Sequence, residues 1–286
     1  MSSLALCLDI GGTHITAAVV KAKDGTFSMF SHVREGVDSM ADKDVILRHW
    51  EIGIDKVLSE LVDPITEIYV SIPGPFDYEK GISLMDGMHK YQSILYMDVK
   101  SYLSEKYAVP TDFIYFFNDA QAFLLGEVYH YGMYEQKVVG LTLGTGLGSA
   151  IFENGKVKDL NYGSAKFRQG IAEDYISTRG IIKYIKTHNH HTFQNVKELV
   201  LSDQWKEEKD KAFNFLADAL VEFIQTYILP LNPSCIILGG SIANAHDLFL
   251  QQVQSSVIIP LKIASMDEMN ICYGMIANVK FNSINK

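Results

Sequence analysis

Asn118 and Asp119 are the side chains of this sequence that are best placed for acid–base chemistry. The apolar run before them, DFIYFF, predicts a buried strand, and AQAFLLGEVYHYG after them predicts a helix. The pair therefore falls at the carboxyl end of a strand. A carboxylate there can act as the general base that deprotonates an attacking hydroxyl. The alternative is that Asp119 only caps the helix, and capping by Asn118 is compatible with catalysis by Asp119.

A glycine turn, Asp9-Ile10-Gly11-Gly12-Thr13, lies between two predicted strands. Glycines there allow positive φ and let backbone N–H groups approach an anion closely. Gly11, Gly12 and Thr13 are then a candidate phosphate cradle, with Asp9 holding magnesium through water. P-loop and Rossmann turns are excluded, because both require a helix after the glycines. An ordinary Gly-Gly hairpin turn remains the alternative for this motif taken alone.

Two further glycine turns end apolar runs in the second half of the chain, after KVVGLTL and within CIILGGS. Their residues are Gly144, Thr145 and Gly146, and Gly239, Gly240 and Ser241. Each turn has a structural explanation by itself. Three turns in this order, each with a polar residue in or beside it, predict a nucleotide held between two lobes.

Hydrophobic periodicity predicts the elements that position these residues. Further strands are expected at LALCLDI, HITAAVVKA, TFSMFSHV, EIYVSIPGPF and VIIPLKIA. Helices are expected at about residues 39–61, 99–107, 171–186, 195–202 and 206–228, and from about residue 270. KVVGLTLGTGLGSAIFENGK repeats the opening plan of strand, glycine turn and strand, which indicates a duplicated unit. The predicted class is α/β with two lobes, residues 1–117 with 270–286, and residues 118–269.

Composition and charge exclude other classes. The formal net charge of −9 comes from scattered residues and leaves no basic face for nucleic acid. No apolar run approaches the roughly 20 residues that span a bilayer, so no membrane partner is expected. Cys7, Cys235 and Cys272 lie in apolar surroundings without metal-ligand spacing, which predicts buried thiols, no disulfide and a cytoplasmic location. The histidines of the polar segment KTHNHHTF are expected to be solvated.

The order and spacing of the motifs resemble the ROK family (repressor, open reading frame, kinase) of sugar kinases, within the actin, hexokinase and Hsp70 superfamily. The matching segments span most of the chain and are LCLDIGGTHITAAVV, SIPGPFDYEKGIS, FFNDAQAFLLGE, LTLGTGLGSAI and LGGSIANA. The resemblance implies a two-lobed actin-like ATPase (ribonuclease H-like) fold with an interlobe cleft for nucleotide and sugar. It also implies ATP and Mg²⁺ as cofactors, a homodimer, and glucokinase-like phosphorylation of a hexose or amino-hexose.

The same resemblance implies roles for individual residues. Asp119 corresponds to the base that takes the proton from the sugar hydroxyl, and Asn118 to an amide that binds a neighbouring hydroxyl. Gly74, in the Pro-Gly-Pro segment, is assigned to the substrate site. Glu173 matches a glutamate that contacts the sugar, and a salt bridge on a helix surface is the alternative for this residue.

Two departures from the family pattern concern the sugar pocket. Asn161 and Ser164 stand where the family carries the Glu and His of a Glu-x-Gly-His motif, so sugar recognition is expected to differ. The cysteines of the family's zinc motif are absent, so no structural zinc is expected and packing alone should support the loop. The alternative function is a non-catalytic sugar or nucleotide sensor of the same fold. A repressor needs an N-terminal helix-turn-helix of about 60 residues, which is not expected because the first motif begins at Asp9.

Overall fold

Two compact units account for the chain. The computed structural model describes residues 3–23, 26–87, 90–189, 193, 195–202, 204–265 and 267–284. The first unit is Met1–Ala122 with Met269–Lys286, and the second is Phe123–Glu268. The boundary between them falls within one helix, α3 (Asp119–Tyr131).

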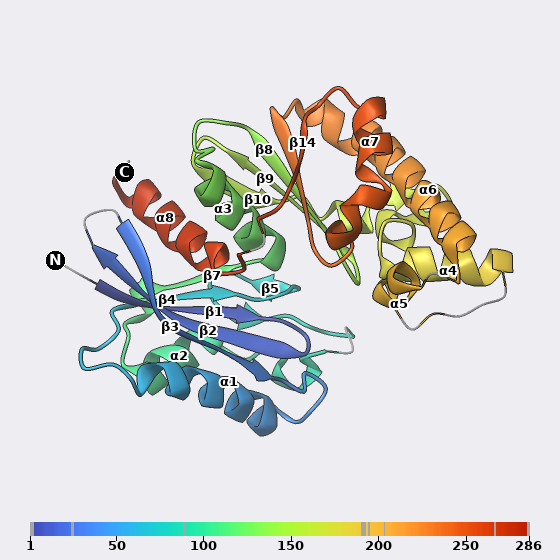
Figure 1. Cartoon of the computed structure of the whole chain (residues 1–286). Coiled ribbons are helices and arrows are strands. Elements are labelled where there is room, and N and C mark those ends of the chain that lie inside the picture. Colours follow the sequence, from blue (N-terminus) through green and yellow to red (C-terminus); the bar gives the residue numbers. More distant parts are fainter. Residues whose placement is uncertain are drawn as a thin grey trace. The chain divides into compact units, whose positions relative to one another are not determined.

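A five-stranded sheet with the order β3-β2-β1-β4-β7 forms the centre of the first unit (Figure 1). Its strands are β1 (Ser3–Ile10), β2 (His14–Lys23), β3 (Thr26–Gly36), β4 (Glu67–Ser71) and β7 (Ile114–Phe117). A short hairpin follows β4 and consists of β5 (Phe76–Asp77) and β6 (Ile82–Ser83). The pairs β1–β2 and β2–β3 are antiparallel, whereas β1, β4 and β7 run parallel. The carboxyl ends of these three parallel strands therefore lie at one edge of the sheet.

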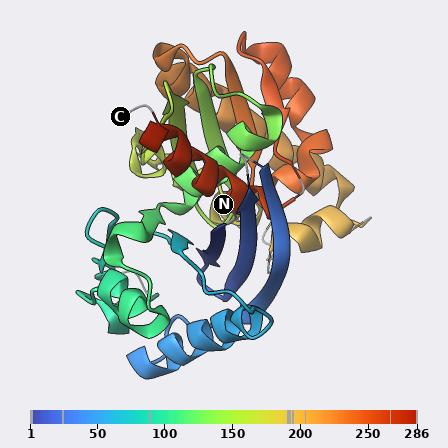
Figure 2. The ribbon, with the colours of Figure 1, turned by 90° about the vertical axis from the view of Figure 1, so that its left-hand side faces the viewer.

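Helices cover both faces of this sheet. They are α1 (Lys43–Leu58), α2 (Val99–Tyr107) and α8 (Asn270–Ile284). α1 and α2 lie on one face and α8 on the other (Figure 2). α1 buries Ile46, Trp50, Ile54 and Val57, the three- and four-residue spacing of an amphipathic helix. It begins four residues after the predicted Ser39, because the Asp38 carboxylate accepts a hydrogen bond from the Met40 N–H at 3.0 Å and bends the chain there.

The second unit repeats the sheet plan of the first, as the predicted duplication requires. Its sheet has the order β10-β9-β8-β13-β14, again with two antiparallel and then two parallel pairings. The strands are β8 (Val138–Leu143), β9 (Leu147–Glu153), β10 (Lys156–Asp159), β13 (Cys235–Gly239) and β14 (Leu261–Ile263). A small hairpin consists of β11 (Lys166–Phe167) and β12 (Gly170–Ile171).

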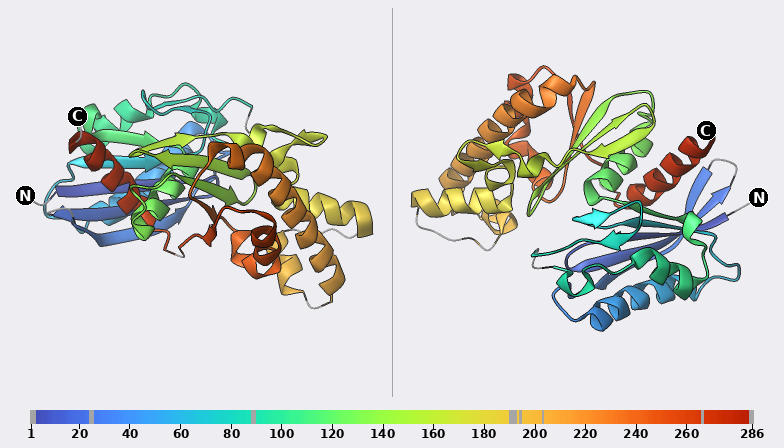
Figure 3. Two further views of the ribbon diagram at one scale, coloured as in Figure 1. Left: turned by 90° about the horizontal axis from the view of Figure 1, so that it is seen from above. Right: turned by 180° about the vertical axis from the view of Figure 1, so that it is seen from behind.

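The helices of the second unit pack on both faces of its sheet (Figure 3). Besides α3 they are α4 (Thr178–Asn189), α5 (Val196–Leu201), α6 (Lys206–Phe223) and α7 (Leu250–Ser256). α3 packs closely on one face, since a Cβ placed on Gly239 would lie 2.4 Å from the Phe123 ring. α6 lies on the other face, where its Phe213, Leu216 and Leu220 are buried. The predicted helix over 171–186 begins only at α4, because Ser177 Oγ accepts the Gly180 N–H at 3.2 Å and caps the helix there.

One continuous helical segment, Lys206–Leu231, is long and apolar enough to cross a membrane by length and composition. Half of its most apolar window is buried inside the unit. α6 begins this segment, and the residues that follow it, Ile224 and Ile228, belong to the same hydrophobic core. This burial is that of a core helix, so the segment is weak evidence for a membrane span.

Gly163 offers a test of the packing in the second unit. A Cβ on Gly163 would lie 2.2 Å from the Leu147 carbonyl oxygen, an atom that cannot move without displacing β9. We expect Gly163→Ala to lower the free energy of unfolding in urea by about 1–3 kcal/mol, the usual effect of overpacking. Gly36→Ala is the control, because no atom lies within 4 Å of its added Cβ. Equal stability of the two variants would contradict the packing described here.

Candidate functional site

Asp9 lies at the carboxyl edge of the first sheet, in register with the ends of the neighbouring strands. Asp9 pairs with Ser71 of β4, and Ser71 pairs with Phe117 of β7. The Ser71 hydroxyl donates a hydrogen bond of 2.8 Å to Asp9 Oδ1. Ser71 is 1% exposed, so its only polar side-chain atom is committed to this edge. Ser71 was not among the residues predicted from the sequence, although a polar residue at the end of a buried strand is a usable signal.

The first glycine turn, Gly11–Thr13, joins β1 to β2 and is held by two hydrogen bonds. The Gly11 N–H donates to the His14 carbonyl at 2.8 Å, and the Tyr91 hydroxyl donates to the Gly11 carbonyl at 2.5 Å. Burial raises the pKa of Tyr91 to about 12, so this hydroxyl stays protonated at neutral pH. A Cβ on Gly12 would meet no atom within 4 Å, which leaves this side of the turn open.

The first turn does not use the positive φ that its glycines allow. Neither Gly11 nor Gly12 has a φ in the left-handed region. The turn closes through the Gly11–His14 hydrogen bond with ordinary dihedrals, so its glycines provide space for an approaching group and are not needed for a left-handed backbone.

Asn118 caps α3 and is one of the two caps, Asn118 or Asp119, considered from the sequence. Its Oδ1 accepts the Ala120 N–H at 2.9 Å, and Gln121 Oε1 accepts the Asn118 N–H at 3.1 Å, which is the reciprocal pattern of a capping box. Asn118 is 8% exposed, whereas the adjacent Asp119 is exposed. Asp119 Oδ1 also accepts the Ala120 N–H at 2.9 Å. The carboxylate of Asp119 is thus oriented by the helix start and remains accessible.

Gly74 lies beside the Asn118 amide, and Tyr78 connects them. Asn118 Nδ2 donates to the Tyr78 hydroxyl at 3.0 Å, and that hydroxyl donates to the Ile72 carbonyl at 3.2 Å. A Cβ on Gly74 would lie 3.1 Å from the Tyr78 hydroxyl and 3.9 Å from Asn118 Nδ2. Tyr78 was not singled out from the sequence, because 40 residues separate it from Asn118.

The two glycine turns of the second unit lie next to each other. Gly239 pairs with Thr142 of β8, and a Cβ on Gly144 would lie 3.8 Å from Ser241 Oγ. Gly240 has a φ of 85° and approaches the Leu143 carbonyl so closely that a Cβ would lie 2.5 Å from its oxygen. Glycine is required at this position for both conformation and space. Thr145, at the tip of the β8–β9 turn, is exposed.

Glu173 lies beside the second glycine turn, Gly144–Gly146. A Cβ on Gly146 would be 2.8 Å from Glu173 Oε2. The Thr178 N–H at the start of α4 donates to the Gly144 carbonyl at 2.8 Å, which attaches the helix to the same turn. Glu173 Oε1 accepts a hydrogen bond of 2.5 Å from Arg179 Nη2. The salt bridge considered as the alternative for Glu173 therefore exists, and it joins a carboxylate before α4 to the first turn of that helix.

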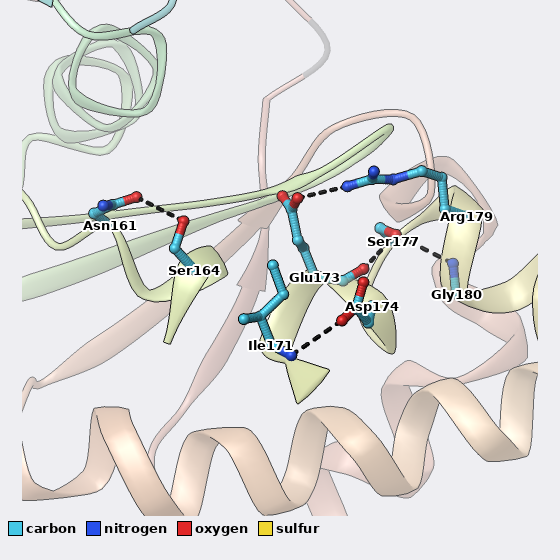
Figure 4. Close-up of polar contacts among 8 residues, drawn as sticks. All are labelled: Asn161, Ser164, Ile171, Glu173, Asp174, Ser177, Arg179 and Gly180. Atoms are coloured by element: carbon cyan, nitrogen blue, oxygen red, sulfur yellow. Dashed lines mark hydrogen bonds and ion pairs between the residues drawn. The ribbon is translucent and has the colours of Figure 1, made fainter. Parts of the chain in front are cut away.

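Asn161 and Ser164 share one turn next to β9. Asn161 has a φ of 49°, and its N–H donates to Asp159 Oδ1 at 2.8 Å. Ser164 Oγ lies 3.4 Å from Asn161 Oδ1, a long hydrogen bond that holds the two side chains together (Figure 4). The Ala172 N–H donates to the Ala165 carbonyl at 3.0 Å and so joins this turn to the segment that carries Glu173.

Arg168 supports the segment between the turn of Asn161 and Ser164 and the residues around Glu173. Its guanidinium carbon lies 5.2 Å from the ring centres of Phe167 and Tyr175 and 5.9 Å from that of Phe215. Its Nη2 forms a 2.8 Å ion pair with Glu222 of α6. The expectation of support by packing alone was incomplete, because a partner 54 residues away is not visible in the local sequence.

No group of three or more His, Cys, Asp or Glu side chains lies close enough to hold a metal ion within the ranges that the structure describes. Of the histidines in KTHNHHTF, His188 is exposed and its Nδ1 lies 2.7 Å from the Tyr184 carbonyl. His190 and His191 lie outside the described residues.

Arg168→Ala should lower the free energy of unfolding by about 1–2 kcal/mol, because it removes the cation–π contacts together with the ion pair. Glu222→Gln removes only the ion pair, whose carboxylate is 49% exposed, and should cost less than about 1 kcal/mol. Urea unfolding of both variants measures the difference. A loss in Glu222→Gln as large as that in Arg168→Ala would show that the aromatic contacts contribute nothing.

Solved structures share this fold at low sequence identity. A ROK family protein from Streptococcus pneumoniae in complex with sucrose has a TM-score of 0.78 and 20% identity, with 99% of this chain and 100% of that chain covered. A ROK family glucokinase from Streptomyces griseus in complex with glucose and AMPPNP has a TM-score of 0.70 and 19% identity, with 98% and 99% covered. The two-lobed actin-like fold predicted from the sequence is confirmed.

Sequence comparison agrees with the structural match. N-acetyl-D-glucosamine kinase of Escherichia coli is 24% identical over 154 residues, which are 44% of this chain and 51% of that kinase. This alignment thus spans about half the length of the kinase. The ROK family model matches residues 5–165 and 168–267, which include every glycine turn and the Asn118-Asp119 pair. The chain therefore belongs to the ROK family.

Proposed function

We propose that this protein is an ATP-dependent sugar kinase that phosphorylates a hydroxyl of a hexose or amino-hexose. The observation that carries the proposal is the carboxyl edge of the first sheet. There, Asp9 and Ser71 are in register with the strand that ends just before Asn118 and the exposed Asp119. Kinase activity in relatives adds support, since the Escherichia coli relative is an N-acetyl-D-glucosamine kinase and the Streptomyces griseus glucokinase binds glucose and AMPPNP.

Asp119 is the proposed general base in the first unit. A base must lie within hydrogen-bond reach of the proton that it takes, and an exposed carboxylate at a helix start can receive a substrate hydroxyl there. Asn118 has a second amide hydrogen besides the one given to Tyr78, and we assign it to a neighbouring sugar hydroxyl. Gly74 leaves space beside this amide. The backbone amides of Gly11–Thr13 are assigned to phosphate oxygens.

In the second unit we assign the turns Gly144–Gly146 and Gly239–Ser241 to the nucleotide, and Asn161, Ser164 and Glu173 to the sugar. Glu173 would exchange its bond to Arg179 for one to a sugar hydroxyl. Such an exchange is inexpensive when the arginine is 62% exposed, because water replaces the lost partner.

Magnesium fits the residues at the edge of the first sheet. Mg²⁺ commonly binds through one or two carboxylates together with substrate phosphates and waters, and Asp9 provides one such carboxylate. The Ser71 hydroxyl orients this carboxylate by donating to Oδ1. When bound with the nucleotide, the ion would neutralise charge on the phosphates. A homodimer is proposed on the family resemblance and is open to sedimentation analysis. A cytoplasmic location is proposed on the buried thiols of Cys7, Cys235 and Cys272.

A second candidate function is a sensor that binds sugar or nucleotide without turnover. Asn161 and Ser164 motivate it, because an amide and a hydroxyl are weaker partners for sugar hydroxyls than a carboxylate.

A panel of sugars with MgATP distinguishes the two functions. The panel contains glucose, mannose, fructose and the N-acetylated amino sugars, and ADP release is the signal. The kinase proposal expects sugar-dependent ADP release with at least one member. Tight binding of sugar or ATP in calorimetry without ADP release would establish the sensor instead.

Asp119→Asn tests the base directly. We expect kcat to fall by at least about 10²-fold, the scale of losing a general base. Folding should be unaffected, since the asparagine amide oxygen can still accept the Ala120 N–H. Asp112→Asn is the control, because Asp112 is an exposed acid of the same unit that lies before β7. A near-normal kcat in Asp119→Asn would remove Asp119 from the mechanism.

A further inference from the structure

Three side chains form a hydrogen-bonded chain at the first glycine turn. Arg34 Nη2 lies 2.9 Å from His14 Nε2, and His14 Nδ1 lies 3.2 Å from the Thr13 hydroxyl oxygen. His14 opposes Gly36 in the β2–β3 pairing, and Arg34 opposes Thr16. Arg34 is therefore a diagonal neighbour of His14 across the two strands.

The chemistry of arginine determines which atoms donate and which accept in these two hydrogen bonds. A guanidinium is permanently protonated and can only donate, so His14 Nε2 must accept its hydrogen bond. An imidazole that accepts at Nε2 is neutral and carries its proton on Nδ1. His14 Nδ1–H then donates to the Thr13 oxygen at a distance within the normal range for such a bond.

The consequence concerns the single proton of the Thr13 hydroxyl. A hydroxyl that accepts a hydrogen bond from His14 cannot donate to the same nitrogen, so its O–H must be directed elsewhere. Thr13 is exposed, and the adjacent Gly12 faces open space. The His14 ring lies against the turn, since a Cβ on Gly11 would be 3.3 Å from its Cε1.

From this arrangement we propose that His14 and Arg34 are positioning residues that orient the Thr13 hydroxyl as a donor to a phosphate oxygen of the nucleotide. The inference rests on the proposed kinase function and adds two residues to it. Arg34 acts through the tautomer of His14 and does not itself touch the phosphate. A competing role for Arg34 is direct contact with the phosphate as a positive charge, and the two roles predict different results in double mutants.

The His14→Asn variant distinguishes positioning through His14 from direct contact of Arg34 with the phosphate. The asparagine amide N–H reaches the position of Nδ1 and always donates, so it supplies the bond to Thr13 without help from Arg34. We expect Arg34→Ala to raise the Kd for ATP about threefold to tenfold, which is the effect of losing one hydrogen bond. His14→Asn should bind ATP within about twofold of the native protein, and Arg34→Ala should have no further effect in that variant.

The experiment is calorimetric titration of ATP, without sugar, into the native protein, Arg34→Ala, His14→Asn and the double variant. In kinetic assays the KM for ATP should rise in Arg34→Ala while kcat and the KM for sugar stay near native. Equal weakening by Arg34→Ala in both backgrounds would overturn the inference, as would no weakening in either or a loss in His14→Asn. If the native protein binds ATP but the variants do not show the expected affinities, only the positioning role of His14 and Arg34 is refuted. A native protein that binds no ATP refutes the kinase proposal as well.

Discussion

The parallel pairing of β1, β4 and β7 is the constraint on which the first unit depends. Parallel strands end at the same edge, so residues separated by about a hundred positions are brought to one line. Asp9, Ser71 and Phe117 are consecutive along this line. The buried Ser71 hydroxyl then joins two of the strands through the Asp9 carboxylate, and Asn118 begins the helix that follows the third.

The second unit also brings the ends of parallel strands to one edge of its sheet, but with different residues there. β8 and β13 are also parallel, and both end in glycine turns, which therefore lie side by side. In these turns glycine is needed because neighbouring atoms lie too close for a side chain. Gly240 faces the Leu143 carbonyl, and Gly146 faces the Glu173 carboxylate. Repetition of one sheet plan thus yields a polar edge with a carboxylate and an amide in one unit and an edge of bare backbone in the other.

Much of this architecture was predictable, because periodicity and turn residues are local properties. The strands before each glycine turn, the helix over Val99–Tyr107 and a cap at Asn118 or Asp119 were predicted, and the structure contains the strands, the helix and a cap at Asn118. The errors arose where side chains redirect the backbone. Asp38 and Ser177 delay their helices by hydrogen bonds to nearby N–H groups, which a hydrophobic pattern does not contain.

The partners of the candidate site residues were harder to predict than the residues themselves. Tyr78 and Asn118 are 40 residues apart, and Arg168 and Glu222 are 54 apart, so only the folded chain reveals these pairs. Arg179 lies six residues from Glu173, yet no helical spacing indicated their pairing, because Glu173 precedes the helix. Motifs therefore identified candidate groups, whereas tertiary structure determines what each group is bonded to.

Tyr91 shows how far the first glycine turn is from an autonomous motif. Its hydroxyl reaches the Gly11 carbonyl across 80 residues, and its own N–H is tied to the Ser39 carbonyl. A contact of such long range forms only after the intervening chain has folded, since the entropy of closing that loop must first be overcome. The hairpin of β1 and β2 can therefore form early with its turn still loose. The shape of the turn is a late product of folding, and a DIGGT segment transplanted to another protein would carry the residues without the hydroxyl that holds them.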